Sequence, residues 1–296
     1  MTDYLAQCLR DEPLARYSAA RLGGNADYLY IARDSVDELA DVVQSAWRDG
    51  LPVRVLGGGA NVLIADAGFR GLVVINRVSQ LTIDADTQTL SVTSGTALTH
   101  LANRCQKRGI SGFEWMVSVP GTVGGAVINN AGAHGGSMHE RVFTVSIVDT
   151  DGTHLYTNAD MSYEYRSSIL KQRADRQFLV LDARLTYQTD APEAIRARMD
   201  SMIAYRKQTQ PSGASLGSIF KNPTGDYAGR LIEASGLKGY QLGAVRVSPV
   251  HANFITNINA QTATADDYYQ IIRHVQQTVL TETGVELALE VELIGF

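Results

Sequence analysis

Residues 53–61 read VRVLGGGAN, a short apolar strand that runs directly into three consecutive glycines. Such a loop leaves backbone N–H groups uncovered by side chains, and bare N–H groups bind phosphate oxygens. Alone, GGG is more often a tight turn, because it matches neither G-x-G-x-x-G nor a P-loop with its lysine. PGTVGGAVINNAGAHGG at residues 120–136 adds a second bare section. Two such sections favour a ligand with an extended diphosphate, such as a dinucleotide.

The segments around the first loop predict a small α/β unit. Ser35 is the expected N-cap of a helix, with Glu38 completing a capping box and Gly50 at the exit. Buried strands are expected at residues 53–56 and 72–75. We therefore assign residues 1–80 to a first α/β subdomain with an N-terminal extension.

Two further units are expected after residue 80. Residues 81–194 combine a hairpin, a helix and long strands, and we predict that they form a second subdomain. Residues 195–296 predict a C-terminal α+β domain, which an amphipathic helix at 190–211 joins to the second unit. In this domain we expect a long helix from Thr264 and a final strand over residues 285–294.

Composition excludes several classes of protein. The chain has 296 residues, of which 45% are hydrophobic and 19% charged, as in ordinary globular proteins. A net charge of -5 provides no broad basic field, so neither nucleic acid nor a membrane is expected as the main partner. Two cysteines are too few for a disulfide framework, and His134 and His139 lack other ligands at zinc spacing, so we expect no metal site. The absence of a signal-peptide pattern predicts a cytoplasmic protein.

Three polar residues stand in unusual settings. Ser218 lies in SLGSIFKNP, next to Gly217 and an apolar pair. Arg166 lies in YEYRSS, where it is either a surface ion-pair partner or, framed by tyrosines and Ser168, a rigid fork for a carboxylate. Glu290 is either an exposed edge acid or, because Ala288 shares its face of the predicted strand, a partly buried carboxyl with a raised pKa.

Seven segments, in order along the chain, resemble the UDP-N-acetylenolpyruvoylglucosamine reductase (MurB) family. They are VLGGGANVLIAD, PGTVGGAVINNAGAHG, YEYRSS, GSIFKNP, AGRLIEASGLKG, HANFITN and LALEVELIG. The resemblance runs from about residue 16 to the last residue. The segment PGTVGGA resembles that of the shorter second type of the family, and the chain lacks the tyrosine-bearing insertion found in another subgroup.

The resemblance implies an α+β protein: a two-subdomain FAD-binding fold of the vanillyl-alcohol-oxidase type, followed by a C-terminal α+β substrate-binding domain. It also implies that both glycine-rich loops hold FAD, which is bound non-covalently. The implied cofactor-binding residues are Gly57, Gly58, Gly59, Ala60, Asn61, Pro120, Thr122, Gly124, Gly125 and Ala126.

The implied activity is that of an NADPH-dependent flavoprotein oxidoreductase of peptidoglycan precursor synthesis. It would reduce UDP-N-acetylglucosamine enolpyruvate to UDP-N-acetylmuramate, with hydride passing from NADPH to flavin N5 and on to the substrate. By resemblance, Arg166 and Glu290 stabilise the enolate and Ser218 protonates its carbon, so that the three side chains meet around one reacting carbon. Tyr165, Lys221 and Asn222 are the implied substrate-binding residues.

Two departures from the family pattern leave questions open. Ala288 replaces a glutamate and Thr209 replaces a lysine, for which Lys207 or Lys221 is a candidate substitute. One alternative function is a flavin-dependent 2-hydroxy-acid oxidase or dehydrogenase of the same fold, although GGGAN lacks the histidine typical of members with covalent flavin. Another is an inactive UDP-sugar or flavin binding protein, which would need none of the three catalytic side chains.

Overall fold

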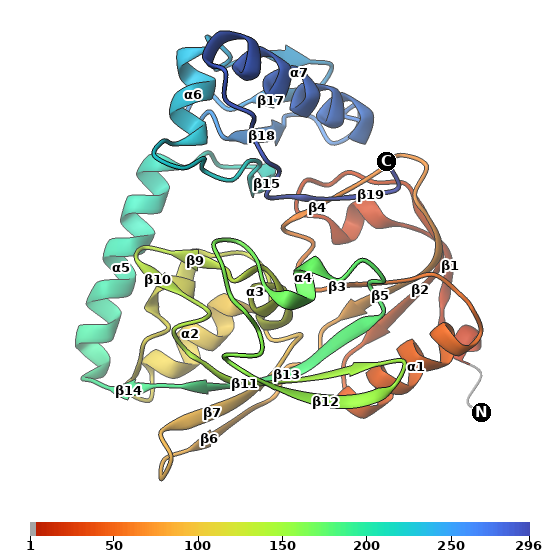
Figure 1. The fold of residues 1–296 in the computed structure, drawn as a ribbon, viewed down its shortest axis with the longest axis vertical. Coiled ribbons are helices and arrows are strands. Elements are labelled where there is room, and N and C mark those ends of the chain that lie inside the picture. The colour runs from red at the N-terminus through yellow and green to blue at the C-terminus, as the bar shows by residue number, and fades with distance from the viewer. Residues whose placement is uncertain (1–3) are drawn as a thin grey trace. The chain divides into compact units, whose positions relative to one another are not determined.

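A computed structural model of the chain describes residues 4–296, which form two compact units (Figure 1). The first consists of residues 4–9, Tyr28–Gly58 and Gly71–Arg206. The second consists of Arg10–Asp27, Gly59–Arg70 and Lys207–Phe296, so it is assembled from both the beginning and the end of the sequence. The division into three sequence domains at residues 80 and 194 stays a prediction.

A four-stranded sheet carries the first glycine-rich loop. Its strands, in sheet order, are β1 (Leu9–Pro13), β2 (Asn25–Ala32), β5 (Phe69–Asn76) and β3 (Val53–Leu56). Helix α1 (Val36–Arg48) buries Leu39 and Val43 in a core with Leu72 and Val74. Since β3 ends at Leu56, the loop begins where the strand leaves the sheet.

The predicted N-cap of α1 is confirmed, but the predicted capping box is wrong. Ser35 Oγ accepts hydrogen bonds from the backbone N–H groups of Asp37 and Glu38, at 3.1 and 3.4 Å. The Glu38 carboxylate accepts instead from the Tyr30 hydroxyl on β2. The hydrogen bond from the buried Tyr30 therefore replaces the expected bond between the Glu38 side chain and the backbone N–H of Ser35.

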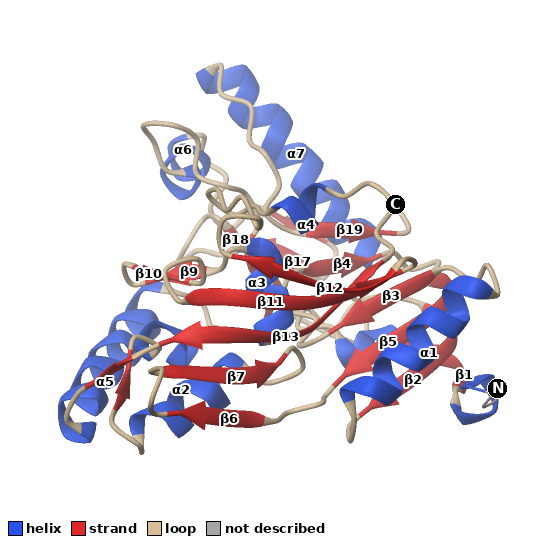
Figure 2. Cartoon of the chain, turned by 60° about the horizontal axis from the view of Figure 1, so that its bottom comes forward, coloured by secondary structure: helices blue, strands red, loops and turns tan. Residues whose placement is uncertain are grey.

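A five-stranded antiparallel sheet forms the centre of the first unit (Figure 2). Its strands, in sheet order, are β12 (Gly152–Thr157), β11 (Val142–Asp149), β13 (Phe178–Thr186), β7 (Thr89–Thr93) and β6 (Leu81–Asp84). Helices α2 (Leu98–Gln106) and α3 (Val123–Asn129) share its core through Leu101 and Val127. Helix α3 begins within the second glycine-rich loop, so packing of this helix in the core fixes the position of the loop.

Shorter elements complete the first unit, and one long helix leads out of it. The short elements are η1 (Tyr4–Gln7), β8 (Ile110–Ser111), η3 (Glu114–Ser118), β9 (Gly132–Ala133), β10 (Gly136–Ser137), α4 (Ile169–Gln172) and β14 (Gln188–Thr189). The long helix is α5 (Pro192–Thr209), which the sequence predicted.

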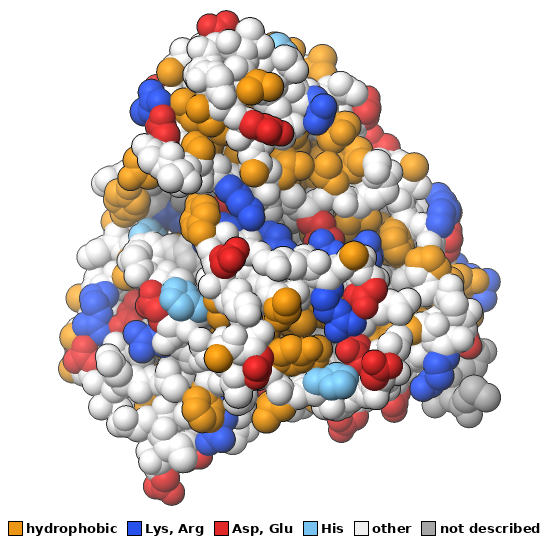
Figure 3. All heavy atoms as spheres, viewed as in Figure 1, with side chains coloured by type: hydrophobic (Ala, Val, Ile, Leu, Met, Phe, Trp, Pro, Cys, Tyr) orange, Lys and Arg blue, Asp and Glu red, His pale blue; other side chains and the backbone are white. Residues whose placement is uncertain are grey.

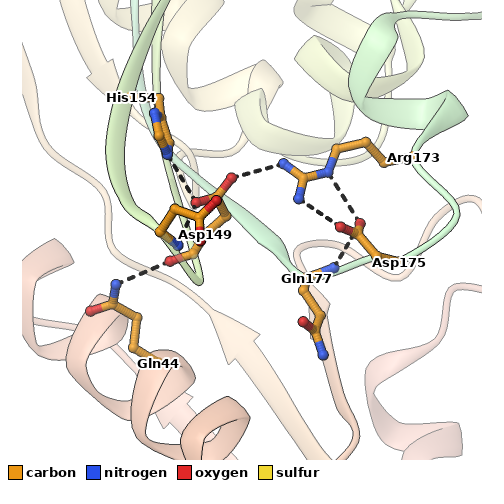
Figure 4. A network of polar contacts seen from close by, with 7 residues as sticks. Gln44, Asp149, His154, Arg173, Asp175 and Gln177 are labelled. Carbon is orange, nitrogen blue, oxygen red and sulfur yellow. Dashed lines mark hydrogen bonds and ion pairs between the residues drawn. The ribbon is translucent and has the colours of Figure 1, made fainter.

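A polar network closes the turn between β11 and β12 (Figure 4). The buried carboxylate of Asp149 accepts from Arg173 Nη1 at 3.0 Å and bonds His154 Nε2 at 2.9 Å, and Gln44 of α1 donates to its backbone carbonyl at 3.2 Å. Burial alone would raise the pKa of Asp149, but Arg173, the Asp151 amide and His154 together hold that pKa below its ordinary value.

The second unit contains a four-stranded antiparallel sheet covered by two helices. Its strands, in sheet order, are β15 (Ala214–Ser218), β18 (Phe254–Asn257), β17 (Val245–Val247) and β16 (Gln241–Leu242). The helices are α6 (Ala228–Ala234) and α7 (Ala265–Thr283), and η2 (Leu14–Tyr17) precedes them in the chain. Thr264 caps α7 as its N-cap, and the fully buried Tyr268 donates to the Ile255 carbonyl at 2.9 Å.

The final strand is shorter than the sequence pattern predicts. Strand β19 spans only Glu292–Ile294, where it pairs in parallel with β4 (Val62–Ile64). The preceding residues lack a continuous partner strand and make a single bridge, between Leu289 and Phe220. Alternating hydrophobicity therefore predicted a continuous strand where the chain instead makes two short pairings, first with residues 219–221 and then with β4.

Acidic and basic side chains are mixed over the face seen in Figure 3, as the small net charge leads one to expect. Among residues 4–296, no helix combines the length and the apolar character needed to cross a membrane.

Candidate active site

The two glycine-rich loops touch each other within the first unit. A Cβ atom on Gly57 would lie 2.1 Å from Thr122 Oγ1, and one on Gly58 would lie 3.0 Å from the Gly121 Cα atom. Any side chain at Gly57 would therefore displace the second loop. The structure thus brings together the two bare backbone sections that the sequence singled out.

The residues of the second loop divide into supporting and open positions. Gly124 packs against Ser94, to whose carbonyl its N–H donates at 2.8 Å, and Ala126 is part of the hydrophobic core. By contrast, Gly125 is exposed, with no neighbour within 4 Å of a Cβ placed there, and Pro120 is also exposed. Of the predicted set, Gly124 and Ala126 shape the loop while Gly125 leaves backbone accessible.

The rest of the first loop belongs to the second unit. Gly59 has φ +59°, and a Cβ there would lie 1.9 Å from the Tyr17 carbonyl oxygen, so glycine is required. Ala60 is half-buried beside it. Asn61 turns its side chain toward the C-terminal segment: Nδ2 donates to the Glu290 carbonyl at 3.0 Å. Asn61 therefore connects the loop to the segment that carries Glu290.

Two serine hydroxyls beside these loops were missed by the sequence reasoning. Ser118 Oγ, two residues before Pro120, and Ser18 Oγ are both buried and have no hydrogen-bond partner within residues 4–296. The Ser18 Cα atom lies 3.0 Å from the position of a Cβ on Gly59. Buried hydroxyls normally find partners, so each is a site where a polar ligand would complete the hydrogen bonding. Only Ser118 had a sign in the sequence, because this residue lies two positions before the second glycine-rich segment.

Arg166 occupies the tip of a tight turn in the first unit. Glu164 and Ser167 exchange two backbone hydrogen bonds of 3.2 Å, which leaves Tyr165 and Arg166 between them. Arg166 has φ +55°, a conformation that side-chain-bearing residues rarely adopt. Its guanidinium lies 5.4 Å from the Tyr165 ring centre, and Nη2 donates to the Gly132 carbonyl at 2.9 Å. The turn and these contacts fix the direction of the guanidinium.

The Arg166 turn rests on the C-terminal end of helix α3. Asn130, the C-cap of that helix with φ +44°, donates from Nδ2 to the Glu164 carbonyl at 2.9 Å. The buried Ser168 hydroxyl donates to the Ile128 carbonyl at 2.6 Å, so it anchors the turn and does not frame the guanidinium as expected. One short helix therefore joins the second glycine-rich loop to Arg166.

Tyr163 completes this region of the first unit. Its hydroxyl is buried without a hydrogen-bond partner in residues 4–296, and burial raises its pKa. The side chain therefore stays neutral at physiological pH.

Ser218 ends strand β15 in the second unit. The pairing of β15 with β18 shifts register between Ser215 and Ser218, and Gly217 takes φ +76° at this irregularity. The Ser218 side chain is half-buried, and its hydroxyl makes no hydrogen bond to any residue from 4 to 296. The hydroxyl is thus held on a fixed backbone but not used by the fold.

Glu290 lies beside Ser218 in the same unit. Its backbone N–H donates at 2.8 Å to the carbonyl of Ile219, the residue after Ser218. The side chain of Glu290 is half-buried. The expected partial burial of Glu290 is therefore confirmed, but Ala288 is exposed and was not a valid sign of it.

Lys221 and Asn222 follow Ser218 toward helix α6. Asn222 Oδ1 accepts from the Ala228 N–H at 3.1 Å, so this side chain helps to begin the helix. The Lys221 ammonium has no hydrogen bond or ion pair within residues 4–296 and is half-buried. Among those same residues no group of three or more His, Cys, Asp or Glu side chains is placed to hold a metal.

Comparison with known proteins places the chain among reductases. Residues 208–294 match the UDP-N-acetylenolpyruvoylglucosamine reductase C-terminal domain, and residues 29–158 match an FAD binding domain. A protein of that reductase name from Bacillus velezensis is 39% identical over 293 residues, which cover 98% of this chain and 95% of the relative. One from Moorella thermoacetica is 41% identical over 291 residues, with 98% and 94% covered. The chain belongs to the UDP-N-acetylenolpyruvoylglucosamine reductase family.

A solved structure agrees with this assignment. The family member from Thermus caldophilus has 32% sequence identity and a TM-score of 0.80, with 97% of this chain and 98% of that chain covered. The predicted fold class, an FAD-binding fold followed by a C-terminal α+β domain, is confirmed. The family consists of FAD-dependent oxidoreductases, and the touching glycine loops with their unpaired hydroxyls fit such a cofactor.

Proposed function

We propose that this chain reduces UDP-N-acetylglucosamine enolpyruvate to UDP-N-acetylmuramate with NADPH, as a step of peptidoglycan precursor synthesis. The observation that carries the proposal is the pairing of Ser218 with Glu290: a fixed hydroxyl and a carboxyl are joined through one hydrogen bond of the Ile219 peptide. A protein that only binds a flavin or a UDP-sugar needs neither group. We place the reaction in the cytoplasm, in keeping with the free thiols of Cys8 and Cys105.

Both glycine-rich loops would hold the cofactor. Gly57, Gly58 and Gly125 carry no side chain of their own over the backbone that would face the cofactor, and Ser118 and Ser18 would donate their unpaired hydroxyls. A bound FAD would supply the hydride-transfer chemistry between NADPH and the enolpyruvyl group. The remaining work, which is to orient the substrate and to manage charge and a proton, falls to side chains of the chain itself.

Arg166 would bind the substrate carboxylate. Because Nη2 is already engaged with Gly132, the guanidinium cannot swing freely and presents its other N–H groups in one direction. Negative charge grows on the carboxylate as the enolate forms, so a preoriented cation stabilises the transition state more than the substrate. Tyr165, stacked on the guanidinium, would line the same substrate position.

Ser218 would give its proton to the enolate carbon. An alcohol is a weak acid, but an enolate carbon is a strong base, and the transfer requires only hydrogen-bond range and a fixed direction. Glu290, in its protonated form, would donate to the enolate oxygen and share the charge with Arg166. Lys221, which has no partner within residues 4–296, and Asn222 would contact the sugar nucleotide on its diphosphate side.

Anaerobic spectroscopy tests this function. NADPH should bleach the flavin absorbance of the purified protein, and the enolpyruvyl sugar nucleotide should then restore it without oxygen. UDP-N-acetylglucosamine without the enolpyruvyl group is the matched control and should leave the flavin bleached. Restoration by oxygen alone would reject the reductase in favour of an oxidase, and a protein that NADPH never bleaches would be a binding protein.

A further inference from the structure

Residues 219–221 directly follow Ser218 and pair through their backbone with two other segments. On one side, the Ile219 carbonyl accepts from Glu290 N at 2.8 Å, and Lys221 N donates to the Ala288 carbonyl at 2.9 Å. On the other side, Ile219 N donates to the Asn253 carbonyl at 3.0 Å. This short segment, which we call the Ser218–Glu290 connector, is therefore the part of the chain that relates the two side chains.

Asn253 binds the connector with its side chain as well. Oδ1 accepts from Phe220 N at 2.9 Å, and Nδ2 donates to the Phe220 carbonyl at 2.8 Å. Asn253 is only 4% exposed, so water cannot take over either bond. A side-chain amide places an acceptor oxygen and a donor NH2 group side by side, so Asn253 can bind the N–H and the carbonyl of Phe220 at the same time.

Sheet pairing holds Ser218 only at the end of its strand, where Ser218 lies opposite Phe254. The register of β15 shifts between Ser215 and Ser218, and β15 ends at Ser218. Beyond Ser218, the contacts come from Asn253. Its carbonyl accepts from Ile219 N, and its side-chain amide makes two hydrogen bonds to the Phe220 backbone. The side-chain amide of Asn253 thus satisfies the backbone groups of Phe220, which lies just beyond the end of β15 and next to the proposed proton donor.

We propose that Asn253 is a positioning residue that sets Ser218 and Glu290 relative to each other for protonation of the substrate. Its bonds reach Ser218 through the adjoining peptide and Glu290 through the Ile219 carbonyl. Glu290 is held at its other backbone group too, since its carbonyl accepts from Asn61. The catalytic importance of this arrangement rests on the proposed function, whereas the geometry stands without it.

Asn253→Asp is the most informative variant because it keeps the shape of the side chain. A protonated aspartic acid reproduces the fork, with one oxygen accepting from Phe220 N and the O–H donating to the Phe220 carbonyl. An ionised carboxylate has no donor and faces that carbonyl with negative charge. Reoxidation of the reduced flavin by the enolpyruvyl sugar nucleotide should be about 10- to 100-fold slower than in the parent at pH 8.5, and should recover as the pH falls to 5.5.

Asn257→Asp is the matched control. Asn257 is the last residue of strand β18, which begins directly after Asn253. It is similarly buried and donates from Nδ2 to the Ala20 carbonyl at 2.9 Å, away from the connector. Anaerobic stopped-flow should show that both variants are bleached by NADPH within about twofold of the parent rate, and only Asn253→Asp should show reoxidation that slows as the pH rises from about 5.5 to about 8.5. Equal slowing of both half-reactions, or equal behaviour of the two variants, would overturn the positioning role.

Hydrogen exchange separates this inference from the proposed function. At pH 8.5 the amides of Lys221 and Glu290 should exchange faster in Asn253→Asp than in Asn257→Asp, whatever the substrate proves to be. Should the parent itself fail to be reoxidised by the enolpyruvyl sugar nucleotide, the proposed function falls while faster exchange still supports the geometry. Unchanged protection of both amides would refute the role of Asn253 even in an active enzyme.

Discussion

The two units present their key side chains from tight turns in different ways. In the first unit Arg166 itself adopts φ +55°, whereas in the second unit Gly217 takes φ +76° and leaves Ser218 in the strand. A guanidinium at the end of a long side chain must be aimed by its backbone and by the Gly132 carbonyl. A serine hydroxyl is short, so its aim depends on the position of the backbone alone. The first turn therefore orients the Arg166 guanidinium through a strained backbone conformation, whereas the second places Ser218 through a glycine that adopts positive φ without strain.

Loss of the Ser218 hydroxyl should give the largest effect. In Ser218→Ala, reoxidation by the enolpyruvyl sugar nucleotide should slow by about 10²–10⁴-fold, because the proton donor is gone, while bleaching by NADPH stays near the parent rate. Stopped-flow absorbance measures both steps. Ser215→Ala, on the same strand, is the control. Parent-like reoxidation of Ser218→Ala would remove this side chain from the chemistry.

The direction of Arg166 is tested by Arg166→Lys. The charge remains, but a single ammonium cannot make the forked contact, so kcat/KM for the enolpyruvyl substrate should fall about 10- to 100-fold with a raised KM. Steady-state kinetics with NADPH saturating give both constants. Arg230→Lys, an exposed ion-pair partner of Asp226, should change neither constant. If Arg166→Lys saturates and turns over like the parent, the arginine serves only the fold.

Gly217→Ala addresses the placing of Ser218 by backbone. No atom lies within 4 Å of the new Cβ, so only the positive φ opposes the change, at a cost of about 1–2 kcal/mol. Relaxation of the turn should move Ser218 and slow reoxidation about tenfold. Gly236→Ala, with φ +70° and equally open space, should lose similar stability in urea without slower reoxidation. Matching rates in the two variants would show that Gly217 does not aim the hydroxyl.

Asn130→Gly should loosen the Arg166 turn more gently. Glycine keeps the positive φ of the helix C-cap but removes the hydrogen bond to the Glu164 carbonyl, which is worth about 1 kcal/mol. We expect KM for the enolpyruvyl substrate to rise a few-fold, because a loss of about 1.4 kcal/mol weakens binding tenfold. An unchanged KM would mean that Gly132 alone orients the guanidinium.

Asp149→Asn changes stability and should leave both half-reactions unchanged. The folded pKa of Asp149 is lowered, so the ionised carboxylate stabilises the fold above its unfolded pKa of about 3.9, and this contribution is lost as the pH falls through the folded pKa. The variant should be about 1–3 kcal/mol less stable at pH 7, with the difference shrinking in strong acid. Urea unfolding at several pH values checks the trend. A difference that does not vary with pH would exclude the ionised network.

Much of the fold was visible in local sequence. Ser35 is the predicted N-cap of one helix, and the start predicted for the long helix, Thr264, is its N-cap in the structure. The glycine loops could be found because bare backbone has a recognisable composition. These features depend on neighbouring residues, which a linear sequence displays.

Contacts between distant residues could not be predicted in the same way. Asn61 and Glu290 are 229 residues apart, and no local pattern shows that one amide holds the other carbonyl. The Glu38 carboxylate of helix α1 accepts from the Tyr30 hydroxyl on β2, and this contact between a helix and a strand is not visible in the capping-box pattern. The strand expected before Glu292 failed because alternation does not reveal whether a neighbouring strand exists. Asn253 escaped notice because HANFITN reads as an ordinary strand entry.

The parallel pairing of β4 with β19 has a consequence for biosynthesis. Val62 and Glu292 face each other in that ladder, so the early strand must wait for almost the entire polypeptide before its partner is available. At the usual pace of translation this delay is on the order of 10–50 s. During that interval the backbone N–H and C=O groups of β4 lack the partner strand that they have in the folded protein, so the second unit is completed only after the C-terminal residues have been made.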